Sequence, residues 1–145
     1  MTDSLYELRK RELADLALAA RKNAYAPYSG FRVGAALLAR SGKIYLGCNI
    51  ENAAYSPTNC AERTAFFKAI SEGERAFDAI AIAGGAEETV SDIFPPCGVC
   101  RQVMAEFCDP EAFRVYLVKN EKEGESLLLK ELLPLGFGKE KLRLL

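Results

Sequence analysis

The sequence predicts an α/β protein, a three-layer α/β/α sandwich around a mixed, largely parallel sheet of five strands. Segments with helical periodicity alternate with short apolar segments in the order helix, strand, strand, helix, strand, helix, strand, and a weaker last strand follows. Helices that separate the later strands make those strands parallel and cover the sheet on both faces. The 145 residues, 50% of them hydrophobic, suffice for one core, so we expect a single domain over residues 1–145.

The first element is an amphipathic helix. Apolar residues recur at helical spacing from Leu13 to Ala20, and the pattern Ser4-Leu-Tyr-Glu7 is typical of a capping box. The proline and glycine of Ala26-Pro-Tyr-Ser-Gly30 then end the helical pattern. The sequence therefore predicts a helix from residue 4 to about residue 23.

A β-hairpin and a loop follow the first helix. The β-favouring runs Phe31–Arg40 and Lys43–Cys48 flank Ser41-Gly42, which predicts a hairpin with a two-residue turn. Residues 49–59 are polar and contain a proline, so this segment should be a loop.

The second half of the chain alternates helices with strands. Proline suits the first turn of a helix because its missing N–H would have no partner there, so Pro95-Pro96 marks the start of a helix. The predicted elements are helix Cys60–Ile70, strand Asp78–Ala83, helix Cys97–Phe107, strand Phe113–Val118 and strand Glu125–Leu129, with short helical or irregular segments at Glu131–Leu133 and Lys139–Leu145.

Composition excludes several classes of function. The chain has no histidine, which removes Ser-His-Asp triads, Cys-His dyads and histidine metal ligands together. A net charge of -1 provides no positive field for nucleic acid or an anionic membrane. The start of the sequence is charged, and the longest apolar run, Val33–Ala39, has about a third of the length that spans a bilayer. We therefore expect a cytoplasmic protein with neither nucleic acid nor a membrane as its partner.

Three of the five cysteines form a pattern that indicates a metal site. Cys60-Ala-Glu62 stands at one predicted helix start, and Pro96-Cys97-Gly-Val-Cys100 stands at another. Three sulfurs can hold a tetrahedral zinc ion and leave a fourth position for water. Glu62 is placed beside that water, where it can move protons. A cysteine, then x-Glu, then Pro-Cys-x-x-Cys is the pattern of the zinc-dependent deaminases of nucleobases.

Segments along nearly the whole chain resemble the cytidine deaminase family in its short, single-domain form. These segments are Tyr28-Ser-Gly-Phe-Arg-Val-Gly-Ala-Ala-Leu37, Gly47-Cys-Asn-Ile-Glu-Asn-Ala-Ala-Tyr55, Cys60-Ala-Glu-Arg63, Pro96-Cys-Gly-Val-Cys-Arg-Gln102 and Glu131-Leu-Leu-Pro-Leu-Gly-Phe137. The resemblance implies zinc-dependent hydrolysis of cytidine and deoxycytidine to uridine and deoxyuridine with release of ammonia, as in pyrimidine salvage.

The resemblance also implies a role for each site residue. One zinc ion per chain would bind Cys60, Cys97 and Cys100, with Glu62 as the proton shuttle and Arg63 as a hydrogen-bond donor to the ligand thiolates. Substrate contacts would come from Phe31 beside the pyrimidine, Asn49 and Glu51 at the ribose hydroxyls, and Ala61. Tyr55 and Phe137 would complete the pocket of a neighbouring subunit in a homotetramer. Because the carboxylate of Glu51 repels a phosphate, the expected substrate is the free nucleoside and not its 5′-monophosphate.

Other interpretations remain open at this point. Cys97 and Cys100 alone would also suit a redox pair. A structural zinc module would close the site with a fourth ligand, for which Cys48 or Cys108 is available. A deaminase of a cytosine-bearing nucleoside antibiotic would share the metal motif. A deaminase of nucleic acid would need a basic groove with exposed aromatic residues, against which the net charge argues.

Overall fold

The structure, a computed structural model, describes residues 1–142. The helices are α1 (Asp3–Arg21), α2 (Ala61–Ser71), α3 (Gly98–Phe107), α4 (Leu129–Leu132) and the 3-10 helix η1 (Lys139–Leu142). The strands are β1 (Arg32–Ala39), β2 (Ile44–Cys48), β3 (Phe77–Gly85), β4 (Arg114–Val118) and β5 (Gly124–Leu128). The last three residues of the predicted segment Lys139–Leu145 lie outside the described residues.

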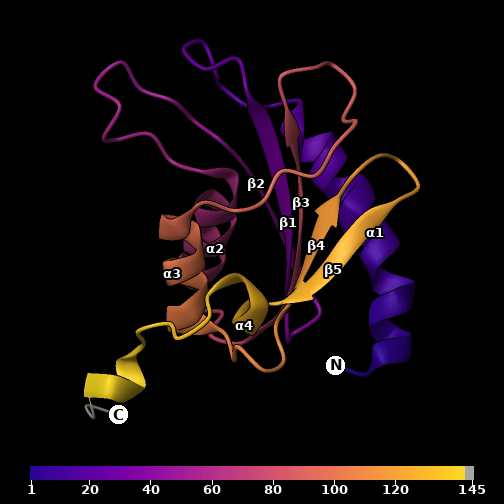
Figure 1. The fold of residues 1–145 in the computed structure, drawn as a ribbon, viewed down its shortest axis with the longest axis vertical. Coiled ribbons are helices and arrows are strands. Elements are labelled where there is room, and N and C mark those ends of the chain that lie inside the picture. Colours follow the sequence, from indigo (N-terminus) through magenta and orange to yellow (C-terminus); the bar gives the residue numbers. More distant parts are fainter. Residues whose placement is uncertain (143–145) are drawn as a thin grey trace.

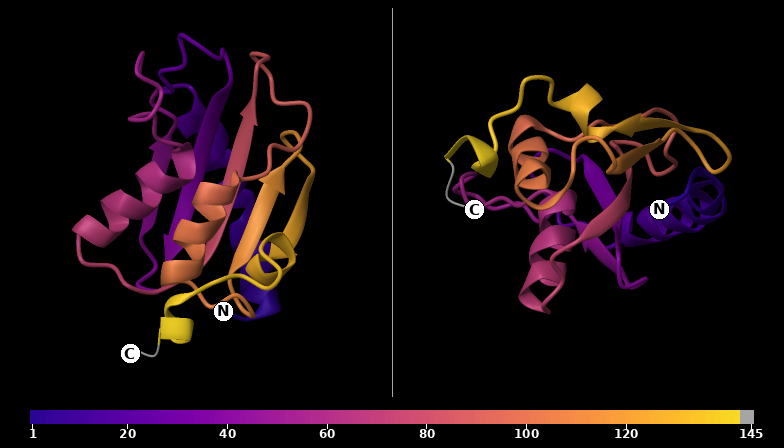
Figure 2. Two further views of the ribbon diagram at one scale, coloured as in Figure 1. Left: turned by 60° about the vertical axis from the view of Figure 1, so that its left-hand side comes forward. Right: turned by 90° about the horizontal axis from the view of Figure 1, so that it is seen from below.

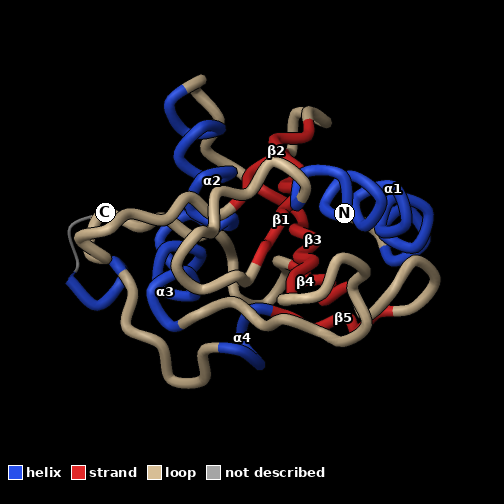
Figure 3. The backbone as a smooth tube through the Cα atoms, turned by 90° about the horizontal axis from the view of Figure 1, so that it is seen from above, coloured by secondary structure: helices blue, strands red, loops and turns tan. Residues whose placement is uncertain are grey.

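The three predicted layers are confirmed. The five strands form one sheet in the order β2-β1-β3-β4-β5, with α1 on one face and α2 and α3 on the other (Figures 1 and 3). The pleat of β3 shows how the sequence divides the core. Ile80 and Ile82 belong to the hydrophobic cluster between the sheet and helices α2 and α3. The small side chains on the opposite face of β3 let α1 pack closely against the sheet; they are Ala79, Ala81 and Ala83.

The prediction of a largely parallel sheet is wrong. Among the described strands, only β3 and β4 pair in parallel, and the other three neighbouring pairs are antiparallel. The reason lies in the connections. Short turns join β1 to β2 and β4 to β5, and a short turn can only join antiparallel strands. The crossover through α2 carries the chain from β2 past β1 to β3, so β1 lies between them and runs against both.

Two local predictions are also wrong in detail. Thr2, not Ser4, caps α1, because the Leu5 N–H donates to Thr2 Oγ1 at 3.2 Å while Ser4 already lies inside the helix. Four residues separate β1 from β2, and because the Ala39 N–H donates to Lys43 O at 2.9 Å, the turn itself has three residues, Arg40 to Gly42. The Gly42 N–H donates to Ala39 O at 2.9 Å, and Gly42 then takes a φ of 95°, as in a type I turn followed by a left-handed glycine.

The C-terminal part leaves the sheet and passes below α3. After β5 the chain forms the single turn α4 and continues as an extended tail to η1, at the end of α3 that is remote from the loop 49–59 (Figures 1 and 2). The left view of Figure 2 shows α2 and α3 side by side on one face of the sheet. No helix among residues 1–142 has the length and apolar character that crossing a membrane requires.

Candidate active site

Three cysteine sulfurs meet where α2 and α3 begin. Cys60 is the N-cap of α2, Cys97 is the N-cap of α3, and Cys100 lies in the first turn of α3. Their Sγ atoms all lie within 4.8 Å of one another, and the Sγ atoms of Cys60 and Cys97 are 3.7 Å apart. Cys100 is buried and Cys97 is exposed, so the cluster is open to solvent on one side.

The cluster fits a zinc ion. A tetrahedral site with Zn–S bonds of about 2.3 Å has sulfur atoms about 3.8 Å apart, close to the separation of the Cys60 and Cys97 sulfurs. All five cysteines are free, so no disulfide competes for the sulfurs. Cys48 and Cys108 are not members of the cluster among the described residues, so a fourth protein ligand from either of them is not supported. The position that a fourth ligand would fill is left for water or substrate.

Glu62 is the one acidic side chain buried beside these sulfurs among the described residues. It is only 3% exposed, and its Oε1 atom is buried without a hydrogen-bond partner. Burial raises the pKa of the Glu62 carboxyl to about 7, while hydrogen bonding to Cys100 acts in the opposite direction. A carboxyl group with a pKa near neutrality can both take up and release a proton, as general acid–base catalysis requires.

Arg63 supplies positive charge to the cluster. Its Nη2 donates to the Cys60 sulfur at 3.3 Å. Hydrogen bonds from Cys100 first and from Arg63 second lower the pKa of the Cys60 thiol to about 5, although burial opposes them. Its hydrogen bond to Cys60 and its burial raise the pKa of the Cys100 thiol above the usual range while no metal is bound. The lowered pKa favours the thiolate form of Cys60, which is the form that binds a metal.

Close packing between β2 and α2 fixes the start of α2. A Cβ atom at Gly47 would lie 2.3 Å from Ala61 O and 2.6 Å from Ala65 N, distances that no side chain can occupy. Glycine at this position lets the first turn of α2 lie directly on the strand. Ala61 is fully buried in that turn, between Cys60 and Glu62.

Asn49 holds the backbone that carries Phe31. The Asn49 Nδ2 donates to Phe31 O at 2.7 Å, and Asn49 Oδ1 accepts from the Val33 N–H at 2.9 Å. The amide keeps one N–H and one lone pair for a further partner. Phe31 itself is half-exposed, and its ring lies 5.8 Å from the ring of Phe94.

Glu51 and Tyr55 line a separate surface hollow of about 340 Å³ together with Tyr28, Ser29 and Thr58. The Glu51 carboxylate accepts hydrogen bonds from the backbone N–H groups of Tyr28 and Ser29 and from the Ser29 hydroxyl. These bonds, that of the hydroxyl first, lower the pKa of Glu51, so this group stays negative. Tyr55 is 72% exposed and has a φ of 61°, a strained conformation for a tyrosine.

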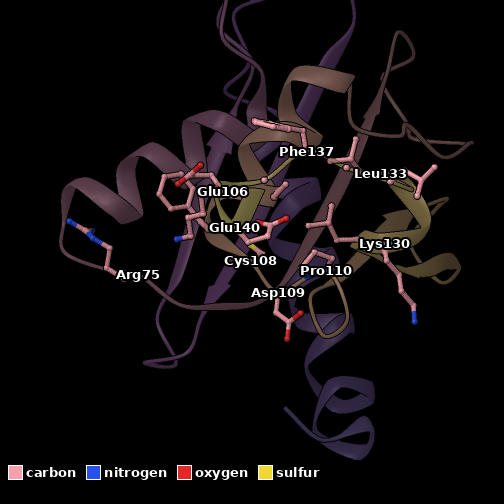
Figure 4. Close-up of a pocket in the computed structure, with 16 residues that line it drawn as sticks. Arg75, Glu106, Cys108, Asp109, Pro110, Lys130, Leu133, Phe137 and Glu140 are labelled. Atoms are coloured by element: carbon pink, nitrogen blue, oxygen red, sulfur yellow. The ribbon is translucent and has the colours of Figure 1, made fainter. Parts of the chain in front are cut away.

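Phe137 lies away from the cysteine cluster of its own chain. It is 60% exposed on the tail, where Gln102 Nε2 donates to its carbonyl oxygen at 2.7 Å. Figure 4 shows its ring at a cavity of about 590 Å³ between the end of α3 and the tail, with Cys108, Leu133 and Lys130 among the lining residues. None of the residues predicted to bind metal or substrate, apart from Phe137, lines this cavity.

Three further residues support the site and were not predicted from the sequence. Ser29 anchors Glu51, Phe94 packs on Phe31, and Arg101 Nε donates to Pro96 O at 2.8 Å, one residue before Cys97. Arg101 also donates to Leu132 O at 2.6 Å and so joins the start of α3 to α4. Their partners are either distant in sequence or carbonyl oxygens, so no side-chain pattern in the sequence indicates these contacts.

Comparison with known proteins agrees with this geometry. The family model described as the cytidine and deoxycytidylate deaminase zinc-binding region matches residues 8–116. A cytidine deaminase of Sporosarcina psychrophila is 57% identical over 123 residues, which cover 85% of this chain and 87% of the relative. A cytidine deaminase of Halalkalibacterium halodurans is 52% identical over 124 residues, covering 86% and 90%. The crystal structure of cytidine deaminase from Burkholderia pseudomallei has a TM-score of 0.79 at 43% identity, covering 94% of this chain and 100% of that one.

Proposed function

The chain belongs to the family of cytidine and deoxycytidylate deaminases, and we propose that it hydrolyses cytidine and deoxycytidine to uridine and deoxyuridine with release of ammonia. One observation carries the proposal: three cysteine sulfurs lie within 4.8 Å of one another, and a buried carboxylate oxygen without a partner lies beside them. The sulfurs of Cys60, Cys97 and Cys100 suit one zinc ion per chain, and the carboxylate suits the proton transfers of the reaction.

Glu62 carries the protons. When bound, zinc makes a water molecule acidic enough to serve as the nucleophile at neutral pH. The Glu62 carboxylate takes a proton from this water and delivers it to N3 of the pyrimidine as the water oxygen adds to C4. Glu62 then moves the second proton to the amino group on C4, the C–N bond breaks, and ammonia and the 4-keto product leave. A pKa near 7 lets one carboxyl group perform both transfers.

The positive charge at the cluster balances the thiolates. Three thiolates and a divalent zinc ion sum to -1, which by itself would make the bound water a weaker acid. The first turns of α2 and α3 direct partial positive charge at the cluster, and the Arg63 guanidinium donates to Cys60 Sγ. Arg63 thereby withdraws charge from the sulfur and supports the acidity of the water.

The nucleoside would be held by the segments around Phe31, Asn49 and Glu51, and we propose that Ala61, between Cys60 and Glu62, also contacts it. Phe31 offers its exposed ring to the base, and the free N–H and lone pair of Asn49 suit a ribose hydroxyl. The ionised Glu51 suits neutral hydroxyl groups as an acceptor and repels a 5′-phosphate. The substrate is accordingly the free nucleoside.

The active unit is proposed to be a homotetramer of single-domain chains spanning residues 1–145, acting in the cytoplasm in pyrimidine salvage. Tyr55 and Phe137 support the oligomer because both expose large aromatic rings to solvent. Leu135, beside Phe137 on the tail, is also fully exposed. A second copy that covers these side chains would remove apolar surface from water and bring Phe137 to a neighbouring site.

The test is ultraviolet monitoring of cytidine with the purified protein, combined with zinc analysis and light scattering. We expect conversion to uridine, one zinc ion per chain and the mass of a tetramer. A higher kcat/KM for cytidine than for cytidine 5′-monophosphate is expected as well, and the reverse order would contradict the role of Glu51. Zinc at one per chain without turnover of cytidine, but with turnover of a cytosine-bearing nucleoside antibiotic, would replace the proposed substrate.

A further inference from the structure

The segment between β3 and α3 forms a wall beside Phe31. Residues 86–96 contain neither helix nor strand and lead directly to Cys97 (Figure 1). They pass from one face of the sheet to the other, because Val90 packs in the cluster under α1 whereas Phe94 packs against the cluster under α2 and α3. Phe94 then meets Phe31 at 5.8 Å between ring centroids, and both rings line a hollow of about 270 Å³.

Arg21, the last residue of α1, reaches into this segment. It is 6% exposed, and Arg21 Nε donates to Arg32 O at 2.9 Å. Its Nη1 donates to Glu88 O at 2.8 Å, and its Nη2 donates to Gly85 O at 2.9 Å and also to Glu87 O. The guanidinium has no carboxylate partner among the described residues, so carbonyl dipoles alone compensate its buried charge.

The hydrogen bonds from Arg21 hold residues 86–95 to the rest of the protein. Within residues 1–142, every hydrogen bond between residues 86–95 and the rest of the protein comes from Arg21, and the one other bond joins the Ile93 N–H to Asp92 inside the segment. The carbonyl oxygens of four residues, from Arg32 to Glu88, accept from this one side chain. A side chain that bonds to all four must carry several donors in a fixed arrangement. The planar fork of arginine has five N–H donors, whereas lysine has one ammonium group.

We infer that Arg21 is a positioning residue for the pyrimidine pocket, holding the 86–96 segment so that Phe94 stays packed against Phe31. The inference rests on the proposed function, in which Phe31 lies beside the base. Arg21 does not touch the substrate. Its effect passes through the backbone carbonyls of Gly85, Glu87 and Glu88 to Phe94, and from Phe94 to the ring of Phe31.

The test compares Arg21→Met in the wild-type background and in a Phe94→Leu background. Methionine keeps an apolar stem but donates nothing, so we expect KM for cytidine to rise about tenfold while kcat changes less than about threefold, the pattern of lost uniform binding. Zinc should remain at one per chain. In the Phe94→Leu background the same substitution should raise KM less than about twofold further, because the contact that Arg21 supports is already lost. A merely structural role would lower the melting temperature and the active fraction but leave KM unchanged.

Controls separate this inference from the proposed function. Lys22→Met changes the next residue, which is exposed, and should leave KM unchanged. Limited proteolysis with a glutamate-specific protease needs no activity, and cleavage after Glu87 and Glu88 should become faster in Arg21→Met. Wild-type KM together with wild-type cleavage in Arg21→Met overturns the inference, whereas failure of the wild-type protein to deaminate cytidine overturns only the proposed function. If Arg21→Met does not fold, Arg21→Lys is measured instead, and a wild-type KM in that variant overturns the inference as well.

Discussion

Gly47→Ala tests whether the close contact between β2 and α2 sets the geometry of the active site. The new Cβ would lie 2.3 Å from Ala61 O and 2.6 Å from Ala65 N, and both are backbone atoms that cannot rotate away. Restoring a contact of about 3.3 Å requires the first turn of α2 to move by about 1 Å. Cys60 and Glu62 belong to that turn, and a misplacement of about 1 Å at reacting groups costs roughly 10²-fold in rate.

The assay measures kcat/KM for cytidine, zinc content and thermal unfolding. We expect kcat/KM to fall about 10²-fold and the free energy of unfolding to fall by about 1–3 kcal/mol from overpacking. Gly42→Ala is the matched control. Alanine at a φ of 95° is strained and should also lower the free energy of unfolding by about 1–3 kcal/mol, but this residue lies in the turn of the same hairpin, at the end away from Gly47. It should lose stability and retain kcat/KM. A Gly47→Ala variant with kcat/KM within about threefold of wild type would refute the reasoning.

Three further predictions test single residues. Glu62→Gln should retain zinc and fold but lose about 10²- to 10⁴-fold in kcat for cytidine, because an amide carries no proton to N3; activity within a few-fold of wild type would dismiss this role. Cys97→Ser should bind much less than one zinc ion per chain by elemental analysis, and full zinc content would remove Cys97 from the ligand set. Phe66 is completely buried between Phe77 and Phe113, so Phe66→Ala should lose about 3–5 kcal/mol in urea unfolding, and a loss below about 1 kcal/mol would contradict its place in the core.

The layers and the individual helices and strands could be predicted from the sequence because each is indicated by residues that lie close together in the chain. The alternation in β3 between Ile80 or Ile82 and the flanking alanines is a pattern of adjacent residues, and it assigns each face of the strand without reference to its neighbours. Strand order is not local in this way. The position of β1 between β2 and β3 depends on how the α2 crossover packs, and the expectation of a largely parallel sheet failed there.

The same distinction holds in the active site. Cys60 and Glu62 are two residues apart, and Cys97 and Cys100 bracket one helical turn; together they match the motif of the zinc-dependent deaminases, so the sequence indicates a common site. The bond from Ser29 to Glu51 joins residues 22 apart, and Arg21 uses carbonyl oxygens that every residue possesses. Bonds to backbone carbonyls have no residue signature, so the sequence could not indicate them.

The absence of histidine explains why the cluster needs so many compensating groups. Without a neutral imidazole ligand, a zinc ion held by Cys60, Cys97 and Cys100 would have three thiolate ligands, and each would add negative charge beside the bound water. Neutral thiols would avoid the charge but would not bind the metal. The positive charge that offsets the thiolates must therefore come from groups that are not metal ligands. A helix N-terminus provides it readily because its first N–H groups have no partner within the helix. Placing Cys60 and Cys97 as N-caps gives the site two such termini, and Arg63 adds a full charge one turn further along α2.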